Sequence, residues 1–318
     1  MMRIVADDWK HQATGFKEIG CGGEAVIYKM RDDVVGKVFM QPDDLQFKGN
    51  KELQKAAEVR IEEMQKKIFK FPRGLPAGFV VPTGALVNKK KEVFGYVMPY
   101  VKGIGMDKLA QTDSKLTDAQ IAKILCSLHK LVSEIHTKGV VIGDFNENNI
   151  IVDSNHEAHI VDTDSCQFGE YLCRNFMPHF VAPELVVGDK SSTSNESQTK
   201  QTKKVSEQPK SFVLLTPHTE LTDWYSFMVI AMRLITSTGP YGGVLGEMDL
   251  YQRFLERATV FDRRVKYPMN AVPLSDVPRS VLELFFRFFY RGERFIPDVK
   301  VFDDLVQSKT TRRFKRRK

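Results

Sequence analysis

The sequence predicts an α+β protein of two lobes, a small β-rich N-lobe with one helix and a larger, mainly helical C-lobe. The chain has 318 residues, more than one typical domain, and 42% of them are hydrophobic, which is enough for a substantial core. Glycine-punctuated β-type segments come first and long helical segments follow. Between them Pro99 cannot donate to a β-ladder, so a strand should end there and a lobe boundary should fall near residues 99–105.

A glycine-rich hairpin opens the predicted N-lobe. Its bend contains Gly20, Gly22 and Gly23, and the returning strand, Val34–Phe39, carries Lys37. Glycine lets backbone N–H groups approach phosphates closely, and a lysine on the return strand can reach the same phosphates. An ordinary strand lysine is the alternative interpretation of Lys37.

The N-lobe helix is predicted over Gly49–Phe71, because apolar residues recur there at steps of three and four. Its acidic residues, Glu58 and Glu62 among them, are candidates to pair with Lys37, and a solvated acidic face is the alternative. Two further N-lobe strands are expected at Val80–Val87 and Val93–Tyr100.

Helices dominate the predicted C-lobe. Apolar residues on one face predict an amphipathic helix over Thr117–Lys138. A strongly apolar helix, Thr222–Thr236, should be buried on most sides, with Asp223 at its start capping backbone N–H groups. Further helices are expected at Leu250–Ala258 and Ser280–Tyr290.

The segment Gly139–Asp164 carries the most chemical information. Short β-rich runs alternate there with loops rich in Asp and Asn, so polar side chains should lie at strand ends. Asp144 and Asn149 are five residues apart, and Asp162 follows thirteen residues later. Carboxylate and amide oxygens suit Mg2+, and a further carboxylate can accept a proton from a substrate hydroxyl. Two ordinary β-turns are the alternative, because turns are commonly rich in Asp and Asn.

In this order and spacing, the segments resemble the eukaryotic-type Ser/Thr protein kinase fold. The resemblance is greatest to the divergent bacterial and phage protein-kinase-like branch, which carries D-x-D-S in place of D-F-G, and it covers roughly residues 14–305. It implies a bilobal protein-kinase-like fold. G-C-G-G-E-A-V-I-Y matches the loop that covers the phosphates, and Lys37 matches the lysine that contacts the α- and β-phosphates.

The resemblance also implies partners for the nucleotide. Glu58 matches the helix glutamate that pairs with Lys37 by the apolar pattern, whereas Glu62 better fits the distance to the proline that ends the helix. The adenine-contacting hinge is matched by Met98–Val101, with Met98, Tyr100 and Val101 as the expected contacts.

For the C-lobe, the resemblance makes Gly143–Asn149 the catalytic loop. Asp144 then has the role of catalytic base, and Asn149 and Asp162 the role of metal ligands. Ala182-Pro183-Glu184 matches A-P-E, whose glutamate is expected to pair with Arg294. The buried helix Asp that holds the catalytic loop is matched by Asp223.

The chain departs from the family pattern in three places. Ile142 and Gly143 replace the His and Arg of H-R-D. Asn146 replaces a Lys of the catalytic loop, and Thr163 and Asp164 replace the Phe and Gly of D-F-G. The missing Arg normally reads a phosphate on the activation loop, so switching by that route is in question. The usual flip of D-F-G is also in question, because Thr163 and Asp164 replace its Phe and Gly.

The resemblance implies an ATP- and Mg2+-dependent protein kinase that transfers the γ-phosphoryl group to Ser/Thr hydroxyls of protein substrates, itself included. The A-P-E match and Asp223 favour a protein over a small-molecule substrate. The alternative is a pseudokinase, an ATP-binding or protein-interaction module, which the lost Lys and Arg favour.

Composition adds expectations about the ends of the chain and its surroundings. The seven Lys and Arg residues of the tail, 309–318, account for the whole net charge of +7, so the tail could contact nucleic acid or an acidic partner, or simply be solvated. The absence of a long apolar run, of a signal peptide and of paired cysteines indicates no membrane contact and a cytoplasmic protein. The predicted parts are an extension (1–13), the nucleotide-binding N-lobe (14–99), the C-lobe (100–308) with a flexible polar insertion (188–211), and the tail.

Overall fold

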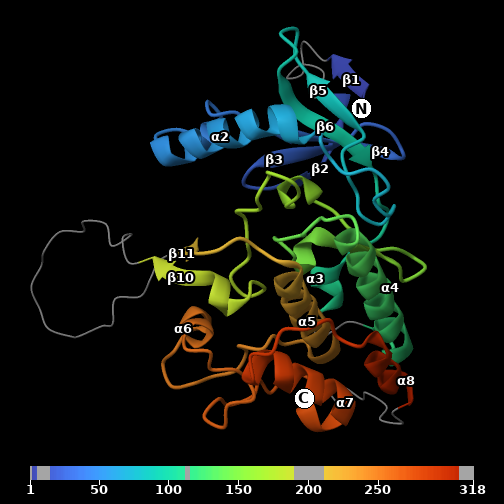
Figure 1. Ribbon diagram of the computed structural model, residues 1–318, viewed down its shortest axis with the longest axis vertical. Coiled ribbons are helices and arrows are strands. Elements are labelled where there is room, and N and C mark those ends of the chain that lie inside the picture. Colours follow the sequence, from blue (N-terminus) through green and yellow to red (C-terminus); the bar gives the residue numbers. More distant parts are fainter. Residues whose placement is uncertain (1, 6–14, 112–114, 190–210, 308–318) are drawn as a thin grey trace, which may run out of the picture. The chain divides into compact units, whose positions relative to one another are not determined.

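The computed structural model describes residues 2–5, 15–111, 115–189 and 211–307. The chain forms two compact units. We call Met1–Gly103 together with His159–Asp164 the N-terminal unit, and Ile104–Ala158 together with Ser165–Lys318 the C-terminal unit. The first is built on a mainly antiparallel sheet and the second is mainly helical (Figure 1), so the predicted α+β class is confirmed and the fold is compatible with two lobes.

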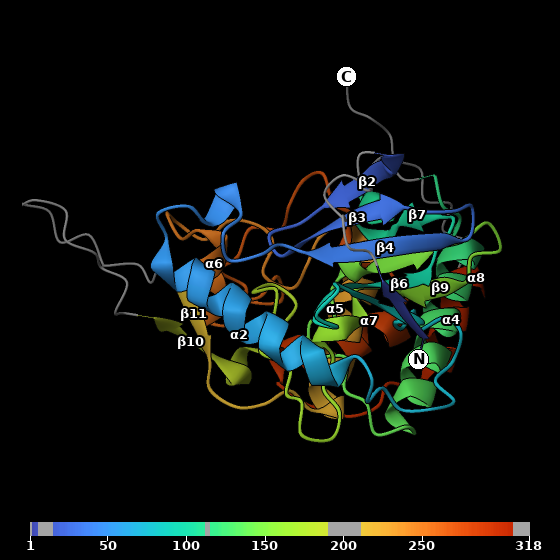
Figure 2. The ribbon, with the colours of Figure 1, turned by 90° about the horizontal axis from the view of Figure 1, so that it is seen from above.

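A six-stranded sheet forms the N-terminal unit, in the order β1-β5-β6-β4-β3-β2. Its strands are β1 (Met2–Val5), β2 (Lys17–Cys21), β3 (Ala25–Lys29), β4 (Val34–Phe39), β5 (Gly84–Val87) and β6 (Val93–Pro99). Figure 2 shows β2, β3 and β4 side by side, as the predicted glycine hairpin requires. Strand β6 ends at Pro99, also as predicted.

The start of the chain corrects one expectation. Residues 1–13 were expected to be an extension outside the lobe, but β1 pairs in parallel with β5 and so adds a strand to the sheet. The segment is too short and too near the end of the chain for its periodicity to reveal a strand, and its partner is about 80 residues away in sequence.

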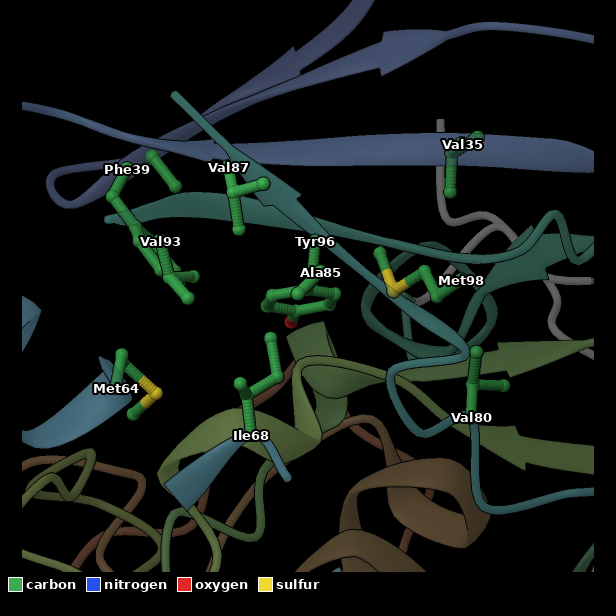
Figure 3. Close-up of a cluster of buried hydrophobic side chains, with 11 residues drawn as sticks. Val35, Phe39, Met64, Ile68, Val80, Ala85, Val87, Val93, Tyr96 and Met98 are labelled. Atoms are coloured by element: carbon green, nitrogen blue, oxygen red, sulfur yellow. The ribbon is translucent and has the colours of Figure 1, made fainter. Parts of the chain in front are cut away.

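Helix α2 (Lys51–Lys67) covers this sheet and packs on β6. It begins later than expected because Asn50 caps it, accepting the backbone N–H of Leu53 at 3.1 Å. Met64 and Ile68 of this region join a buried cluster with Tyr96, whose ring lies in the middle of the side chains drawn in Figure 3. The short helix η2 (Leu45–Phe47) precedes α2.

The C-terminal unit contains the remaining helices. They are α3 (Met106–Leu109), α4 (Asp118–His136), α5 (Glu220–Thr236), α6 (Leu250–Leu255), α7 (Arg279–Phe285), the π-helix η7 (Phe286–Tyr290) and α8 (Asp304–Gln307). Short 3-10 turns are η3 (Glu147–Asn149), η5 (Pro183–Leu185), η6 (Leu274–Asp276) and η8 (Val299–Asp303). Its strands β7 (Ile104–Gly105) and β8 (Ile150–Val152) pair antiparallel, and β10 (Val186–Asp189) pairs antiparallel with β11 (Ser211–Leu214).

Helix α5 is the buried centre of the C-terminal unit, as its apolar sequence predicts: 14 of its 17 residues are buried. The expected helix cap is wrong, however. The hydroxyl of Thr219 accepts the N–H of Thr222 at 3.2 Å in a capping box. Thr219 therefore caps the helix in place of Asp223, whose carboxylate bonds to groups outside the helix.

The predicted insertion and tail are only partly described. Gly188 and Asp189 belong to β10 and Ser211 begins β11, so the two ends of the predicted insertion are paired strand residues. Residues 190–210 and the basic tail 309–318 lie outside the described residues. Among the described helices, none has the length and apolar character needed to cross a membrane.

Candidate active site

Lys37 makes the central contacts of the N-terminal unit. It lies on β4, is only 7% exposed, and forms ion pairs with Asp162 and with Asp164, the latter at 2.7 Å from Nζ to Oδ1. The Tyr96 hydroxyl donates to the same Asp164 oxygen at 2.8 Å. Two acids and one lysine thus gather where the sequence analysis expected a phosphate-binding lysine and a metal-binding Asp.

The backbone after β9 (Ala158–Ile160) brings these acids to the sheet. The N–H of Val80 donates to the Ile160 carbonyl at 2.9 Å, and the Thr163 hydroxyl donates to the Val80 carbonyl at 2.7 Å. Asp162 adopts a left-handed conformation with φ of 59°, and the 3-10 turn η4 (Thr163–Ser165) follows it. This bend lets both Asp162 and Asp164 face the same lysine, although they are two residues apart.

The three charges change one another's pKa values. Burial raises the pKa of Asp162, to about 6, with Asp164 adding to the rise and Lys37 opposing it. Burial would also raise the pKa of Asp164, but Lys37 and the Tyr96 hydrogen bond lower it to about 2. Burial would lower the pKa of Lys37, yet the two carboxylates raise it above its ordinary value. Lys37 and Asp164 are therefore an ion pair at neutral pH.

The expected pairing of Lys37 with a helix glutamate is wrong in this structure. Glu58 and Glu62 are both exposed, and neither is a partner of Lys37. The inward face of α2 carries Ala57 and Met64 instead. The signal for the true partner was present in the sequence as the second acid of Asp162-Thr163-Asp164.

The glycine bend between β2 and β3 is open. A Cβ added at Gly22 would lie no closer than 3.9 Å to another atom, and one at Gly23 would meet nothing within 4 Å. The protein's own packing therefore does not demand glycine at these two positions. Glu24 at the end of the bend is tied to α2 by an ion pair with Arg60 at 3.0 Å, a contact the sequence analysis did not foresee.

The predicted hinge residues border the core of the N-terminal unit. Met98 is buried in its main cluster, and Tyr100 and Val101 pack against that cluster. The N–H of Tyr100 donates to the Asp33 carbonyl at 2.8 Å, and Lys29 lies over the Tyr100 ring at 4.6 Å. Their contact with adenine stays a prediction.

In the C-terminal unit, Asp223 of α5 holds the start of the loop Gly143–Asn149. It is fully buried and accepts the backbone N–H groups of Ile142 at 2.7 Å and Gly143 at 2.9 Å. His136 of α4 contacts it at 2.9 Å. The role that the resemblance implied for Asp223 is confirmed.

The same geometry explains why glycine replaces the arginine of H-R-D. Gly143 has a φ of +78°, a left-handed conformation that disfavours side chains. A Cβ there would lie 2.5 Å from the sulfur of Cys173, which packs against the loop. An arginine at this position has no room in this structure.

Asparagines orient Asp144 within the loop. The Asn146 side chain is buried and donates to the Asp144 carboxylate at 2.9 Å, and Asn149 donates to the Asp144 backbone carbonyl at 3.0 Å. Asn146 thus occupies the place of the usual lysine and contacts the proposed base directly. The Asn149 amide oxygen receives no hydrogen bond from any described residue, so it is available as a ligand.

Two bidentate ion pairs lie in this unit, one with an exposed glutamate and one with a buried glutamate. Arg294 makes a bidentate pair with Glu184 at 2.6 and 2.7 Å, which confirms the pairing implied by the resemblance. Arg233 of α5 makes a second bidentate pair with Glu147 of the catalytic loop, at 2.6 Å for both bonds. This second pair could not be predicted from the sequence, because nothing in the spacing of Glu147 and Arg233 distinguishes them from other charged residues.

The donor atoms fit Mg2+ in kind. Asp162 supplies a carboxylate and Asn149 an amide oxygen, both hard ligands. Within the described residues, however, no group of three or more His, Cys, Asp or Glu could hold a metal ion alone. Hard oxygen donors of either kind suit Mg2+, which also takes oxygens from nucleotide phosphates and water.

Comparison with known proteins finds a distant relative. A probable serine/threonine-protein kinase of Clostridium acetobutylicum is 25% identical over 151 residues. The match covers 46% of this chain and 21% of that protein, so the chain spans about a fifth of the relative's length. No family model matches the chain. The similarity supports a kinase-like relationship.

Proposed function

We propose that the chain is an ATP- and Mg2+-dependent protein kinase that transfers the γ-phosphoryl group of ATP to Ser/Thr hydroxyls of protein substrates, including its own. The observation that carries the proposal is the buried Lys37 of β4, paired with Asp162 and Asp164, in a sheet whose β2–β3 bend does not need its glycines for packing. A lysine beside a carboxylate is the arrangement that binds nucleotide phosphates and their metal in kinases.

Each unit has its own part in the proposed reaction. In the N-terminal unit, Lys37 binds the α- and β-phosphates, and Asp162 is a metal ligand. Mg2+, when bound, neutralises charge on the phosphates. In the C-terminal unit, Asn149 is the other protein ligand of the metal.

Asp144 is the proposed proton acceptor. Its carboxylate is half-buried and oriented by the Asn146 amide at 2.9 Å, and the loop that carries it is fixed through Asp223. A carboxylate held in this way can orient a substrate Ser or Thr hydroxyl and take its proton as the oxygen attacks the γ-phosphorus.

The test is incubation of the purified chain with Mg-ATP, alone and with a mixed protein substrate, followed by mass spectrometry for phosphate on Ser and Thr. We expect phosphorylation by the wild-type chain and none by the Asp162→Ala variant. ATP binding without phosphate transfer would support the pseudokinase alternative instead, which the replacement of the usual lysine by Asn146 favours.

A further inference from the structure

We infer that Asp164 is the residue that holds Lys37 in place, in the role that the kinase resemblance would give to a glutamate of α2. The inference rests on the proposed function, because Lys37 is the lysine proposed to contact the nucleotide phosphates. Asp164 is a positioning residue that acts through Lys37.

The contacts of Asp164 are those of a permanent partner. The residue is 5% exposed, and one of its carboxylate oxygens lies 2.7 Å from Lys37 Nζ and 2.8 Å from the Tyr96 hydroxyl. Lys37 itself is buried to a similar degree. Charges removed from water in this way are tolerated only when paired and hydrogen-bonded, so each of the two depends on the other.

The helix acids are not available for this role. Glu58 and Glu62 are exposed, while the buried positions of α2 are Ala57, Met64 and Lys67. The acid that a kinase helix would supply therefore comes from the segment after β9. This explains why the sequence has Asp164 where the D-F-G motif has glycine, because the Asp164 side chain pairs with Lys37.

The two acids differ in how firmly they are fixed. The Asp162 side chain is 46% exposed, whereas that of Asp164 is 7% exposed and bonded by Tyr96. Asp162 can therefore bind another cation while Lys37 stays paired with Asp164 as its counter-ion. The division of roles is that the buried Asp164 holds the lysine and the more exposed Asp162 serves as the metal ligand.

A double-mutant cycle on thermal stability tests the pairing without any need for activity. We expect Lys37→Met and Asp164→Asn each to lower Tm by about 4 °C or more. Lys37→Met leaves the buried Asp164 carboxylate without its cation, and Asp164→Asn leaves the buried Lys37 with only the more exposed Asp162. The double variant should lose no more than the worse single variant, because both charges leave together. As a matched control, Lys37→Met combined with Glu52→Gln, an exposed acid of α2, should show additive shifts.

Two results of this cycle would overturn the inference. One is additive Tm losses for Lys37 and Asp164. The other is a non-additive cycle between Lys37→Met and Glu58→Gln, which would show that Glu58 of α2 is the acid that holds Lys37.

Nucleotide binding then separates positioning from metal binding. We expect Asp164→Asn to weaken Mg-ATP binding at least about tenfold in the wild-type background and to change it no further in the Lys37→Met background. Tyr96→Phe should act in the same direction and less strongly. If Asp164→Asn weakened Mg-ATP binding further in the Lys37→Met background, Asp164 would be a metal ligand and the inference would be refuted. If the wild-type chain transfers no phosphate, the proposed function fails, while the Tm cycle still decides the role of Asp164.

Discussion

At the scale of single residues, the chain departs from the kinase pattern that it resembles at two positions of the loop that carries Asp144. Asn146 contacts the carboxylate of Asp144 where a lysine is usual, and Gly143 accepts a left-handed backbone where an arginine is usual. Both replacements leave Asp144 oriented on a loop whose backbone is bonded to buried groups. The departures therefore do not by themselves indicate a lost activity.

The first prediction concerns the proposed base. Asp144→Ala should lower phosphate transfer by roughly 10²–10⁴-fold, the usual contribution of a positioned proton acceptor, while Mg-ATP binding is retained. Turnover is measured by phosphate incorporation and binding by calorimetry. Unchanged turnover would remove Asp144 from the reaction.

The second prediction concerns Gly143. Gly143→Ala should destabilise the chain by about 1–3 kcal/mol, because its Cβ would contact the Cys173 sulfur and its φ is +78°. Denaturant unfolding measures the loss. Gly139→Ala is a matched control, since Gly139 has a φ of +69° but nothing within 4 Å of its Cβ position, and it should cost less. Equal losses would show that the contact with Cys173 contributes nothing.

At the scale of elements, α5 connects the core of the C-terminal unit to the loop Gly143–Asn149. Its apolar side chains bury it, Asp223 at its first turn binds the loop backbone, and Arg233 near its end binds Glu147. One rigid helix thus fixes the loop at two points. Position and rigidity of the loop follow from the packing of the helix.

The third prediction follows from this arrangement. Asp223→Asn should lower the unfolding free energy by about 1–3 kcal/mol, because one amide oxygen cannot replace a carboxylate that accepts from Ile142, Gly143 and His136. It should also lower turnover more than it weakens ATP binding. A variant with wild-type stability would show that these bonds do not hold the loop.

Sequence reasoning succeeded where local pattern and family spacing agree. The glycine hairpin, the apolar α5 and the Glu184–Arg294 pair were all foreseen. It failed where the deciding contact is long-range: the partner of Lys37 lies 127 residues away, and β1 pairs with a distant β5. Spacing within a helix cannot show which of several acids faces a lysine, since that depends on how the helix packs.

At the scale of the whole molecule, the chain divides its proposed chemistry between two units. The N-terminal unit holds Lys37 with two acids, and the C-terminal unit holds Asp144 and Asn149 on a fastened loop. The strands β10 and β11 bring the ends of the polar segment together at Asp189 and Ser211. That pairing allows the segment between them to be removed without opening the fold.

The fourth prediction uses this pairing. The predicted insertion 188–211 contains nine Ser and Thr hydroxyls, eight of them between residues 190 and 210, and follows the A-P-E match closely in sequence. Self-phosphorylation should fall mostly there, since a tethered acceptor has a high effective concentration. Replacing residues 190–210 by an Asn-Gly turn should keep Tm and remove most of the phosphate found by mass spectrometry. Unchanged phosphate incorporation would rule the segment out.

The central claim is that Lys37 binds the phosphates of ATP and that Asp162 binds its metal ion. Calorimetry of ATP binding, with Mg2+ and with a chelator, tests it most directly in the wild-type chain and in Asp162→Ala at matched Tm. The account predicts that Mg2+ strengthens ATP binding by the wild-type chain and that Asp162→Ala loses this dependence. Equal Mg-ATP affinity in the two proteins, or no ATP binding by the wild-type chain, would contradict it.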